Sequence, residues 1–269
     1  MISISNRYRK LATQWQQIRR HSWMVVLFFC TLLTISAIRV KEGKLIQGIE
    51  IVVTPLAEGD YLLNQDTVTN LLTRSFTKPL DQLFLAEVDL GRLEAVLARH
   101  PLVAEAEVML DTDMELHISI TQRNPLVRII SNNGQNYYLD QTGAKMPLSR
   151  GFTARVPVAS GNIVAWSDDY LSRPEHQLYQ LFALVKLFQS DDFLSALIEQ
   201  IYYTNQGELV LAPKVGDQVI YLGRYDPAKT LERLNRLKVF YAKGLPYEGW
   251  KKYSSFDLRY EKQVVCQKK

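Results

Sequence analysis

The side chains most often used in catalysis are present but scattered along the sequence. The four histidines are His21, His100, His117 and His176. None of them has a second histidine or a carboxylate at the spacing of metal ligands. The sequence also contains no Gly-x-Ser-x-Gly, His-Glu-x-x-His or Cys-x-x-Cys pattern and no glycine-rich phosphate loop. The residues therefore predict a protein that is not an enzyme and that needs no cofactor or metal.

Three acidic side chains cluster in the stretch LDTDMEL, at Asp111, Asp113 and Glu115. Closely spaced oxygens can hold a cation, but Ca²⁺ usually takes six or more oxygen ligands in a loop that contains glycine. This stretch has no glycine. The pattern therefore indicates a solvated hairpin turn and not a metal site.

The strongest pattern for binding lies near the end of the sequence, in YSSFDLRYEKQVVCQKK. Apolar and charged side chains alternate there, namely Phe256, Leu258 and Tyr260 with Asp257, Arg259 and Glu261. This period of two predicts a half-buried strand. A strand at a sheet edge can bind another chain through its unpaired N–H and C=O groups, although its charges could instead protect the edge. Because Arg and Tyr are enriched in interface hot spots, Arg259 and Tyr260 are the first candidates for partner contacts.

The composition indicates a folded protein with an uneven charge. Of the 269 residues, 47% are hydrophobic and 22% are charged, which suits a chain of one or two packed domains. Residues 1–38 hold five Lys or Arg and no Asp or Glu, so the net charge of +4 leaves −1 for the rest of the chain. That remainder has no basic footprint for nucleic acid, and no nucleic-acid partner is expected.

Residues 21–38, HSWMVVLFFCTLLTISAI, contain no Asp, Glu, Lys or Arg and predict a transmembrane helix. A helix of this length rises about 27 Å, close to the ~30 Å hydrocarbon core of a bilayer. The basic residues before it, and the mixed RVKEGK after it, predict a cytoplasmic N-terminus. The side chains expected to contact the membrane are Trp23, Val25, Leu27, Phe28, Leu32 and Ile35.

Two other interpretations of this segment remain open. A buried core helix can have this composition, although it seldom carries a one-sided basic flank. A cleavable signal peptide follows the same charge pattern, but Thr34 and Ser36 make a poor small-x-small site among large neighbours. An uncleaved anchor would place residues 41–269 on the far side of the membrane. In a bacterium that compartment is the periplasm. Cys30 would then lie within the membrane, far from Cys266, so no disulfide is expected.

The first part after the anchor predicts a small α+β unit. A strand ends at Pro55, one helix follows, and a second helix runs from Asp89 to Pro101. Leu83–Val88, between the helices, is expected to be extended. Two alternating runs, LVAEAEVML and ELHISITQR, then form a hairpin around DTDM. The expected order is strand, helix, helix, strand, strand, with both helices on one face of a three-stranded sheet.

The second part predicts a β-rich domain with flanking helices. An Asn-Gly pair marks a hairpin, and helices are expected at about 174–189 and 192–200. A three-strand meander over IEQIYYT, ELVLA and QVIYLG follows. The next helix has Asp226 as its N-cap and Gly244 as its C-cap. The chain then enters the exposed terminal strand.

The order of these parts along the chain, and three short stretches within them, resemble a known family. ARHPLVAEAEVML followed by LHISITQRNPLVRI is similar to a polypeptide-transport-associated (POTRA) pattern. YYLDQTGAKMP and FDLRY are similar to the β-domain entry and the terminal strand of bacterial FtsQ/DivIB cell-division proteins. The chain departs from that family at Gln122, where Glu is common, and at Met109 and Leu110, where a basic residue is common.

The resemblance implies a single-pass inner-membrane scaffold at the division septum, with its N-terminus in the cytoplasm and its bulk in the periplasm. The implied partners are FtsB/FtsL-like (DivIC-like) membrane coiled-coil proteins, other division proteins and the lipid bilayer. The family's terminal Arg and Tyr bind the periplasmic part of FtsB. They correspond here to Arg259 and Tyr260, with Phe256 and Leu258 beside them. Such a complex would control septal peptidoglycan synthesis.

The expected architecture is α+β and has six parts. They are a basic tail (1–20), a transmembrane helix (21–38), a linker (39–47), a POTRA-like domain (48–124), a β-rich partner-binding domain (125–265) and a tail (266–269). Two other functional classes remain open. One is a POTRA-bearing accessory of envelope transport or outer-membrane assembly, and the other is a membrane-tethered cell-wall enzyme.

Overall fold

The computed structural model describes residues 23–24, 26–34, 45–56, 59–76, 82–149 and 151–269. Two compact units emerge, and each is described by itself. Counting only the described residues, the first comprises those up to Val52, Asp66–Leu97 and Glu107–Ser119, and the second comprises those of Val53–Gln65, Ala98–Ala106 and Ile120–Lys269.

The predicted membrane helix falls only partly within the described residues. Residues 23–24 and 26–34 are helical, and the large apolar side chains described there are exposed. In the part of the chain with a described structure, no helix is both long enough and apolar enough to cross a membrane. The predicted contacts Val25 and Ile35, like the tail 1–20 and most of the linker, lie outside the described residues. The anchor therefore stays a prediction.

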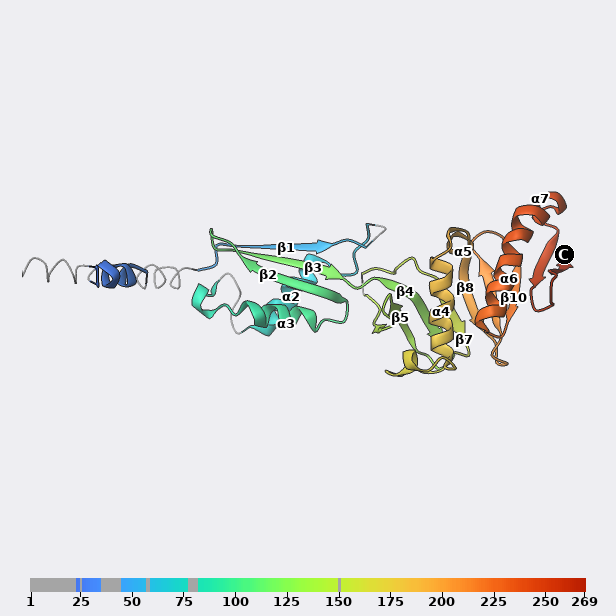
Figure 1. Cartoon of the computed structure of the whole chain (residues 1–269), viewed down its shortest axis with the longest axis horizontal. Helices are drawn as coiled ribbons and strands as arrows, with labels where there is room; N and C mark the ends of the chain where they lie inside the picture. Colours follow the sequence, from blue (N-terminus) through green and yellow to red (C-terminus); the bar gives the residue numbers. More distant parts are fainter. Residues whose placement is uncertain (1–22, 25, 35–44, 57–58, 77–81, 150) are drawn as a thin grey trace, which may run out of the picture. The chain divides into compact units, whose positions relative to one another are not determined.

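The predicted βααββ order is confirmed. Its members are β1 (Gly48–Thr54), α2 (Gln65–Ser75), α3 (Leu90–Ala98), β2 (Val103–Leu110) and β3 (Glu115–Gln122). The strands form one sheet in the order β1-β3-β2, and both helices lie on one face of it (Figure 1). The central strand β3 buries Leu116 and Ile118 at every second position, which is the period of a strand with one covered face.

The segment Leu83–Val88, predicted to be extended, instead contains a short 3₁₀ turn, η2 (Leu85–Glu87). The Glu87 carboxylate accepts a hydrogen bond from the Phe84 amide at 3.2 Å and closes this turn. The start of α3 follows the sequence prediction, since the Asp89 carboxylate accepts the Arg92 amide at 3.0 Å.

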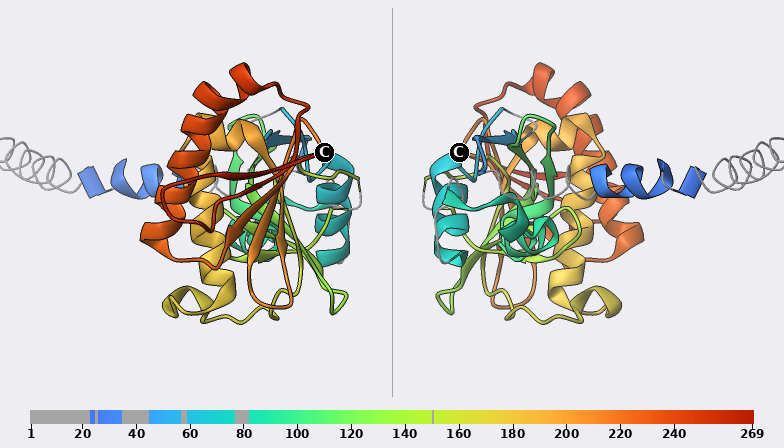
Figure 2. Two further views of the ribbon diagram at one scale, coloured as in Figure 1. Left: turned by 90° about the vertical axis from the view of Figure 1, so that its right-hand side faces the viewer. Right: turned by 90° about the vertical axis from the view of Figure 1, so that its left-hand side faces the viewer.

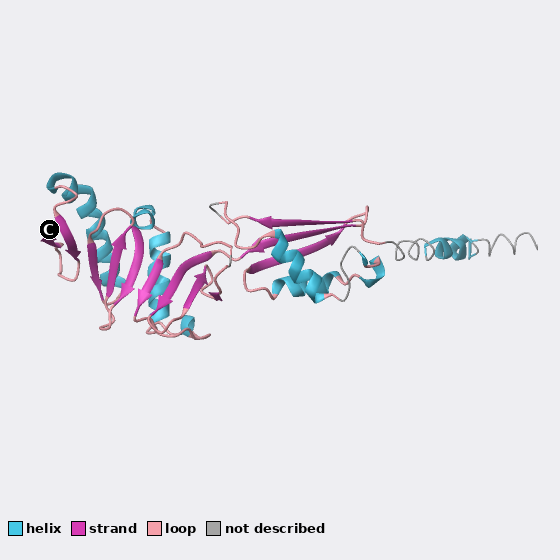
Figure 3. Ribbon diagram, turned by 180° about the vertical axis from the view of Figure 1, so that it is seen from behind, coloured by secondary structure: helices cyan, strands magenta, loops and turns pink. Residues whose placement is uncertain are grey.

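The second part of the chain builds a mixed nine-stranded sheet (Figure 3). Its strands are β4 (Pro125–Ser131), β5 (Asn136–Asp140), β6 (Lys145–Met146), β7 (Val158–Gly161), β8 (Ile198–Tyr203), β9 (Leu209–Pro213), β10 (Val219–Gly223), β11 (Tyr253–Asp257) and β12 (Val265–Lys268). Their order in the sheet is β12-β11-β10-β9-β8-β7-β4-β5-β6. The pairs β4–β7, β7–β8 and β10–β11 are parallel, and the other pairs are antiparallel.

One face of this sheet carries the core. A single cross-strand row on that face is buried from end to end: Ile129, Ala159, Ile201, Leu211, Ile220 and Phe256. The helices α4 (Gln177–Gln189) and α6 (Pro227–Val239) cover this face (Figure 2). Their buried leucines belong to the same core. The short helices η3 (Tyr170–Ser172) and α5 (Asp192–Leu197) complete this layer. Asp226 caps α6 as predicted, by accepting the Lys229 amide at 2.9 Å.

The predicted C-cap at Gly244 is wrong. The helix continues through a π-helical turn, η4 (Phe240–Gly244), into α7 (Leu245–Glu248), and ends at Gly249 with a φ of 96°. Gly244 is needed for a different reason. A Cβ there would lie 2.7 Å from the Phe240 ring, so only glycine lets that ring pack back against the helix.

Gln122, where the sequence departs from the family pattern, is a buried bridge. Its Oε1 accepts the amides of Leu62 and Leu63 at 2.7 and 2.8 Å, and its Nε2 donates to the Thr54 carbonyl at 2.7 Å. A glutamate carboxylate could accept both amides but could not donate to the carbonyl. The change to Gln thus matches its surroundings.

The next residue, Arg123, forms a buried ion pair with Asp140. Nη2 and Nε of Arg123 lie 2.6 and 2.8 Å from Oδ2 of Asp140, whose side chain is only 5% exposed. The other carboxylate oxygen accepts the Thr142 and Ala144 amides. Burial alone would raise the pKa of Asp140, but the hydrogen bonds from Thr142 and Arg123 and the charge of Arg123 lower it below its ordinary value.

Asp140→Ala should therefore strongly destabilise the second unit. The substitution leaves the Arg123 guanidinium buried without its carboxylate, which typically costs about 3–5 kcal/mol. Urea unfolding of the purified chain measures the loss. Asp169→Ala, which breaks an exposed pair with Arg173, is the matched control and should change stability far less.

The same pair predicts the direction of the pH effect. Because the pKa of Asp140 is lowered by folding, its stabilisation is present above the unfolded pKa and is lost as the pH falls through the folded pKa. The difference in stability between the wild type and Asp140→Ala should shrink in acid. A constant difference down to pH 2 would contradict this account of the pair.

Candidate partner-binding edge

The C-terminal edge of the large sheet is formed by β12 and not by the predicted strand. β11 pairs in parallel with β10, and β12 folds back antiparallel onto β11. Among the strands that the structure describes, none pairs with the outer side of β12 (Figure 1). The residues assigned to a C-terminal tail, 266–269, thus supply most of the edge strand. Of the predicted stretch 256–260, only Phe256 and Asp257 lie in a strand, β11, which is one strand further in than the edge. The remaining residues follow the end of β11.

Phe256 and Leu258 cannot contact a partner with their side chains, and this part of the prediction is corrected. Both side chains are fully buried. The Phe256 ring meets the Phe240 ring edge-on at 5.1 Å, and the Leu258 amide donates to the Tyr221 carbonyl at 2.9 Å. The predicted alternation coincides only with the end of a strand, since β11 ends at Asp257 and its burial does not alternate, but Phe256 and Leu258 are both buried in the core. They hold the edge in place.

Arg259 is exposed but already paired within the chain. Its Nη2 lies 2.6 Å from Asp257 Oδ2, and its Nη1 lies 3.0 Å from Glu208 Oε2. The guanidinium carbon lies 5.3 Å from the centre of the Tyr221 ring, at cation–π distance. Two carboxylates and one ring therefore fix this cation in a single orientation.

The charges of this cluster depend on one another. Burial would raise the pKa of Asp257, but hydrogen bonds from Arg259 and its charge lower it below the ordinary value. The hydrogen bonds that Arg259 donates to the Asp257 carboxylate in turn raise the pKa of Arg259. A partner carboxylate would have to compete with Glu208 for the guanidinium. Arg259 is thus better suited to positioning the edge than to attracting an acidic chain.

Tyr260 is the predicted contact residue that is most available. Its side chain is 51% exposed, and it begins the turn that joins β11 to β12. Lys262 in the same turn has a φ of 57°, in the left-handed region. This conformation brings the chain back so that Val265 lies opposite Asp257 at the start of β12. Val265 is 41% exposed, so an aromatic and an aliphatic side chain flank the start of the edge.

A groove of about 610 Å³ lies beside this turn and was missed from the sequence. Its apolar lining includes Val239 and Phe240 of the helical segment and Val264 from the turn. Val239 is 57% exposed, because two residues along a helix turn its side chain about 200° away from that of the buried Leu237. The one available sequence signal was this apolar residue outside the buried stripe of the helix. The π-helical turn of η4, which sequence reasoning did not predict, shapes the rest.

Among the residues with a described structure, the acidic turn and His100, His117 and His176 do not assemble a second site. His117 Nδ1 lies 2.7 Å from Glu50 Oε2, and its Nε2 lies 3.8 Å from Asp111 Oδ2. The Asp111 carboxylate also accepts the Asp113 amide within its own turn. Within the described ranges, no three His, Cys, Asp or Glu residues are grouped so that they could hold a metal ion.

Comparison with known proteins gives two family matches. Residues 124–267 match the model described as FtsQ/DivIB, C-terminal related. Residues 45–121 match the model of the POTRA-like domain. Among curated proteins, no match was found.

The burial of the predicted contact residues leads to a test of their roles. Phe256→Ala should lower the free energy of unfolding by about 3–5 kcal/mol, because it opens a cavity in the core. Tyr260→Ala should change it by no more than ~0.5 kcal/mol, because its side chain is exposed. Chemical denaturation of both variants checks the assignment. A similar loss in both would contradict the division into core and surface residues.

Proposed function

The chain belongs to the FtsQ/DivIB family of cell-division proteins, and we propose that it is a single-pass membrane scaffold that binds an FtsB/FtsL-like pair at β12. The observation that carries this proposal is the outer edge of β12, which no other described strand pairs with, beside the exposed Tyr260. Through this edge the scaffold links early and late division proteins and controls septal peptidoglycan synthesis.

The mode of binding that suits this edge is strand addition. A partner segment pairs with β12 through main-chain hydrogen bonds, which give affinity without requiring a particular sequence. Side chains at alternate positions then give specificity. Those on one side reach Tyr260 and Val265, and those on the other reach the apolar groove at Val239 and Phe240. A buried aromatic or aliphatic anchor in such a groove is typical of interface hot spots.

Residues 21–38 serve as the membrane anchor in this proposal. The described part of the segment supports it, since Trp23, Leu27, Phe28 and Leu32 lie on a helix and are 60%, 52%, 63% and 47% exposed. An isolated helix that is apolar on all sides is unfavourable in water and suits lipid. The basic residues before it orient the N-terminus toward the cytoplasm and the folded units toward the periplasm. The POTRA-like domain would recruit other division proteins.

Tyr260→Lys should weaken capture of the coiled-coil partner by about thirtyfold or more, the loss expected of a hot-spot residue. The measurement is binding of the partner's periplasmic part to the full chain in nanodiscs. Tyr247→Lys, at an 88% exposed position on α7, is the matched control and should bind like the wild type. Unchanged capture by a folded Tyr260→Lys variant would exclude this edge as the docking site.

Depletion of the protein in its native bacterium tests the broader role. Long, multinucleate filaments without septa are expected if the protein acts in the division complex. Normal cell length with a leaky outer envelope would contradict the division role and would favour envelope transport.

A further inference from the structure

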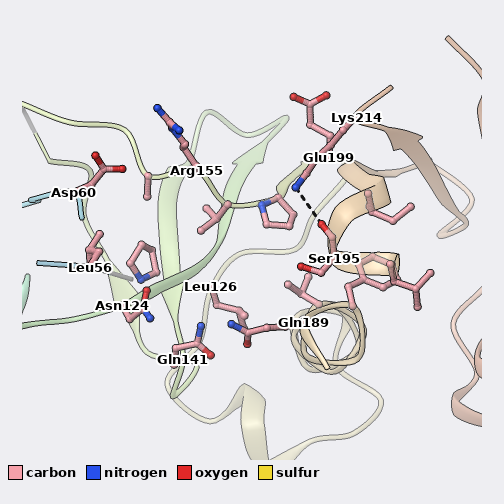
Figure 4. Close-up of a pocket in the computed structure, with 18 of the residues that line it drawn as sticks. Leu56, Asp60, Asn124, Leu126, Gln141, Arg155, Gln189, Ser195, Glu199 and Lys214 are labelled. Atoms are coloured by element: carbon pink, nitrogen blue, oxygen red, sulfur yellow. Dashed lines mark hydrogen bonds between the residues drawn. The ribbon is translucent and has the colours of Figure 1, made fainter. Parts of the chain in front are cut away.

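A second cavity, of about 590 Å³, lies in the second unit, far along the sheet order from β12 (Figure 4). All of its lining residues belong to that unit. Its walls come from the start of β4, the segment 152–157, the end of α4, and α5. Its volume falls within the ~300–1,000 Å³ of ordinary ligand pockets. Nothing in the proposed docking at β12 uses this cavity.

The base of the cavity is apolar. Leu126, Phe188 and Leu194, each no more than 3% exposed, line it from three different elements. Ile198 at the start of β8 extends this lining. Because these side chains are held in the core of the sheet, the base is rigid. It offers a preformed place for an aliphatic or aromatic side chain.

The walls carry three carboxamides, from Asn124, Gln141 and Gln189 (Figure 4). Gln141 already accepts a hydrogen bond from Lys186 at 2.7 Å. The side-chain amides of Asn124 and Gln189 form no hydrogen bond with any residue whose structure is described. Each carboxamide offers a donor and an acceptor together, which is the pairing pattern of a peptide group.

The rim carries charges of both signs. Arg155 and Lys214 lie around the opening together with Asp60 and Glu199. Lys214 is fixed there, since its Nζ donates to the Ser195 carbonyl at 3.1 Å (Figure 4). Balanced charges of this kind do not select a polyanion such as a nucleotide or a phosphate. They suit a ligand that itself carries charges of both signs around an apolar centre.

We propose that this cavity binds a linear peptide segment of a partner protein. One apolar side chain of the segment fills the base over Leu126. Its main-chain amides pair with Asn124 and Gln189, and its flanking charged residues meet Lys214 and Glu199. The site is separate from the β12 edge, so the chain can hold one partner at each place.

Random linear dodecapeptides, displayed on phage and selected on the full chain in nanodiscs, test the proposal. The expected result is a consensus of one apolar position flanked by charged positions. The most enriched peptide, labelled with fluorescein, then serves as the binding probe. Gln189→Trp, which fills the cavity from an exposed helix position, should weaken its binding at least tenfold. Gln200→Trp adds the same side chain at an exposed position that does not line the cavity, and it should leave binding within twofold.

The other outcomes overturn the proposal. They are selection without a consensus, equal binding of the peptide by Gln189→Trp and the wild type, and displacement of the peptide by a purified cell-wall disaccharide tetrapeptide. The last would assign the cavity to a cell-wall ligand. The readout is binding at this cavity alone, so its failure leaves the division role and the β12 edge untouched.

Discussion

The C-terminal half of the second unit depends on one constraint, the parallel pairing of β11 with β10. Two parallel neighbours cannot be joined by a tight turn, so the chain must cross over the sheet between them. The segment α6–η4–α7 makes that crossover and covers the core face with Leu234 and Leu237. The parallel pair β7–β8 imposes the same requirement, which α4 and α5 meet. Both crossovers run the same way along the sheet between strands of the same orientation, so right-handed connections place their helices on the same face.

That constraint also explains why the edge is well ordered at its inner end. Once β11 is set beside β10, Phe256 closes the core row and Leu258 bonds to the Tyr221 carbonyl. Arg259 then ties the end of β11 to Glu208, which lies next to β9. The turn from β11 to β12 therefore begins at residues that are already held in place, Leu258 and Arg259. A partner would meet a surface that is already organised, which reduces the entropy lost on binding.

Regular elements of the fold were predictable wherever local patterns and burial agreed. Leu116 and Ile118 alternate in a strand that is buried on one face, and Asp226 is a strong N-cap, so both were recognised. β7 was missed because four residues of mixed burial give too little periodicity. η4 was missed because a glycine at position 244 is typical of a helix C-cap. In the structure Gly244 instead accommodates the Phe240 ring. Such close contacts are formed by tertiary packing and leave no local pattern.

The candidate site shows the same division. The period of two located only the end of β11, at Phe256 and Asp257, and periodicity states only that alternate residues face one side. The helix α6 covers one face of the sheet and makes that face the core. Phe256 and Leu258 are therefore buried against it. β12 was overlooked because its Val, Cys, Gln and Lys are mostly exposed and lack alternation. The groove at Val239 and Phe240 depends on a helix and a turn about twenty-five residues apart, which no local pattern relates.

The shortness of β12 has a consequence for how long any partner remains. An edge of four residues offers few main-chain hydrogen bonds, and each contributes only about 0.5–1.5 kcal/mol net. A strand docked there would dissociate readily on its own. Tethering both chains to the same membrane would return it to the edge faster than it could diffuse away. Assembly at such an edge would be governed by rebinding and not by a long-lived bond, so subunits could exchange while the complex as a whole persists.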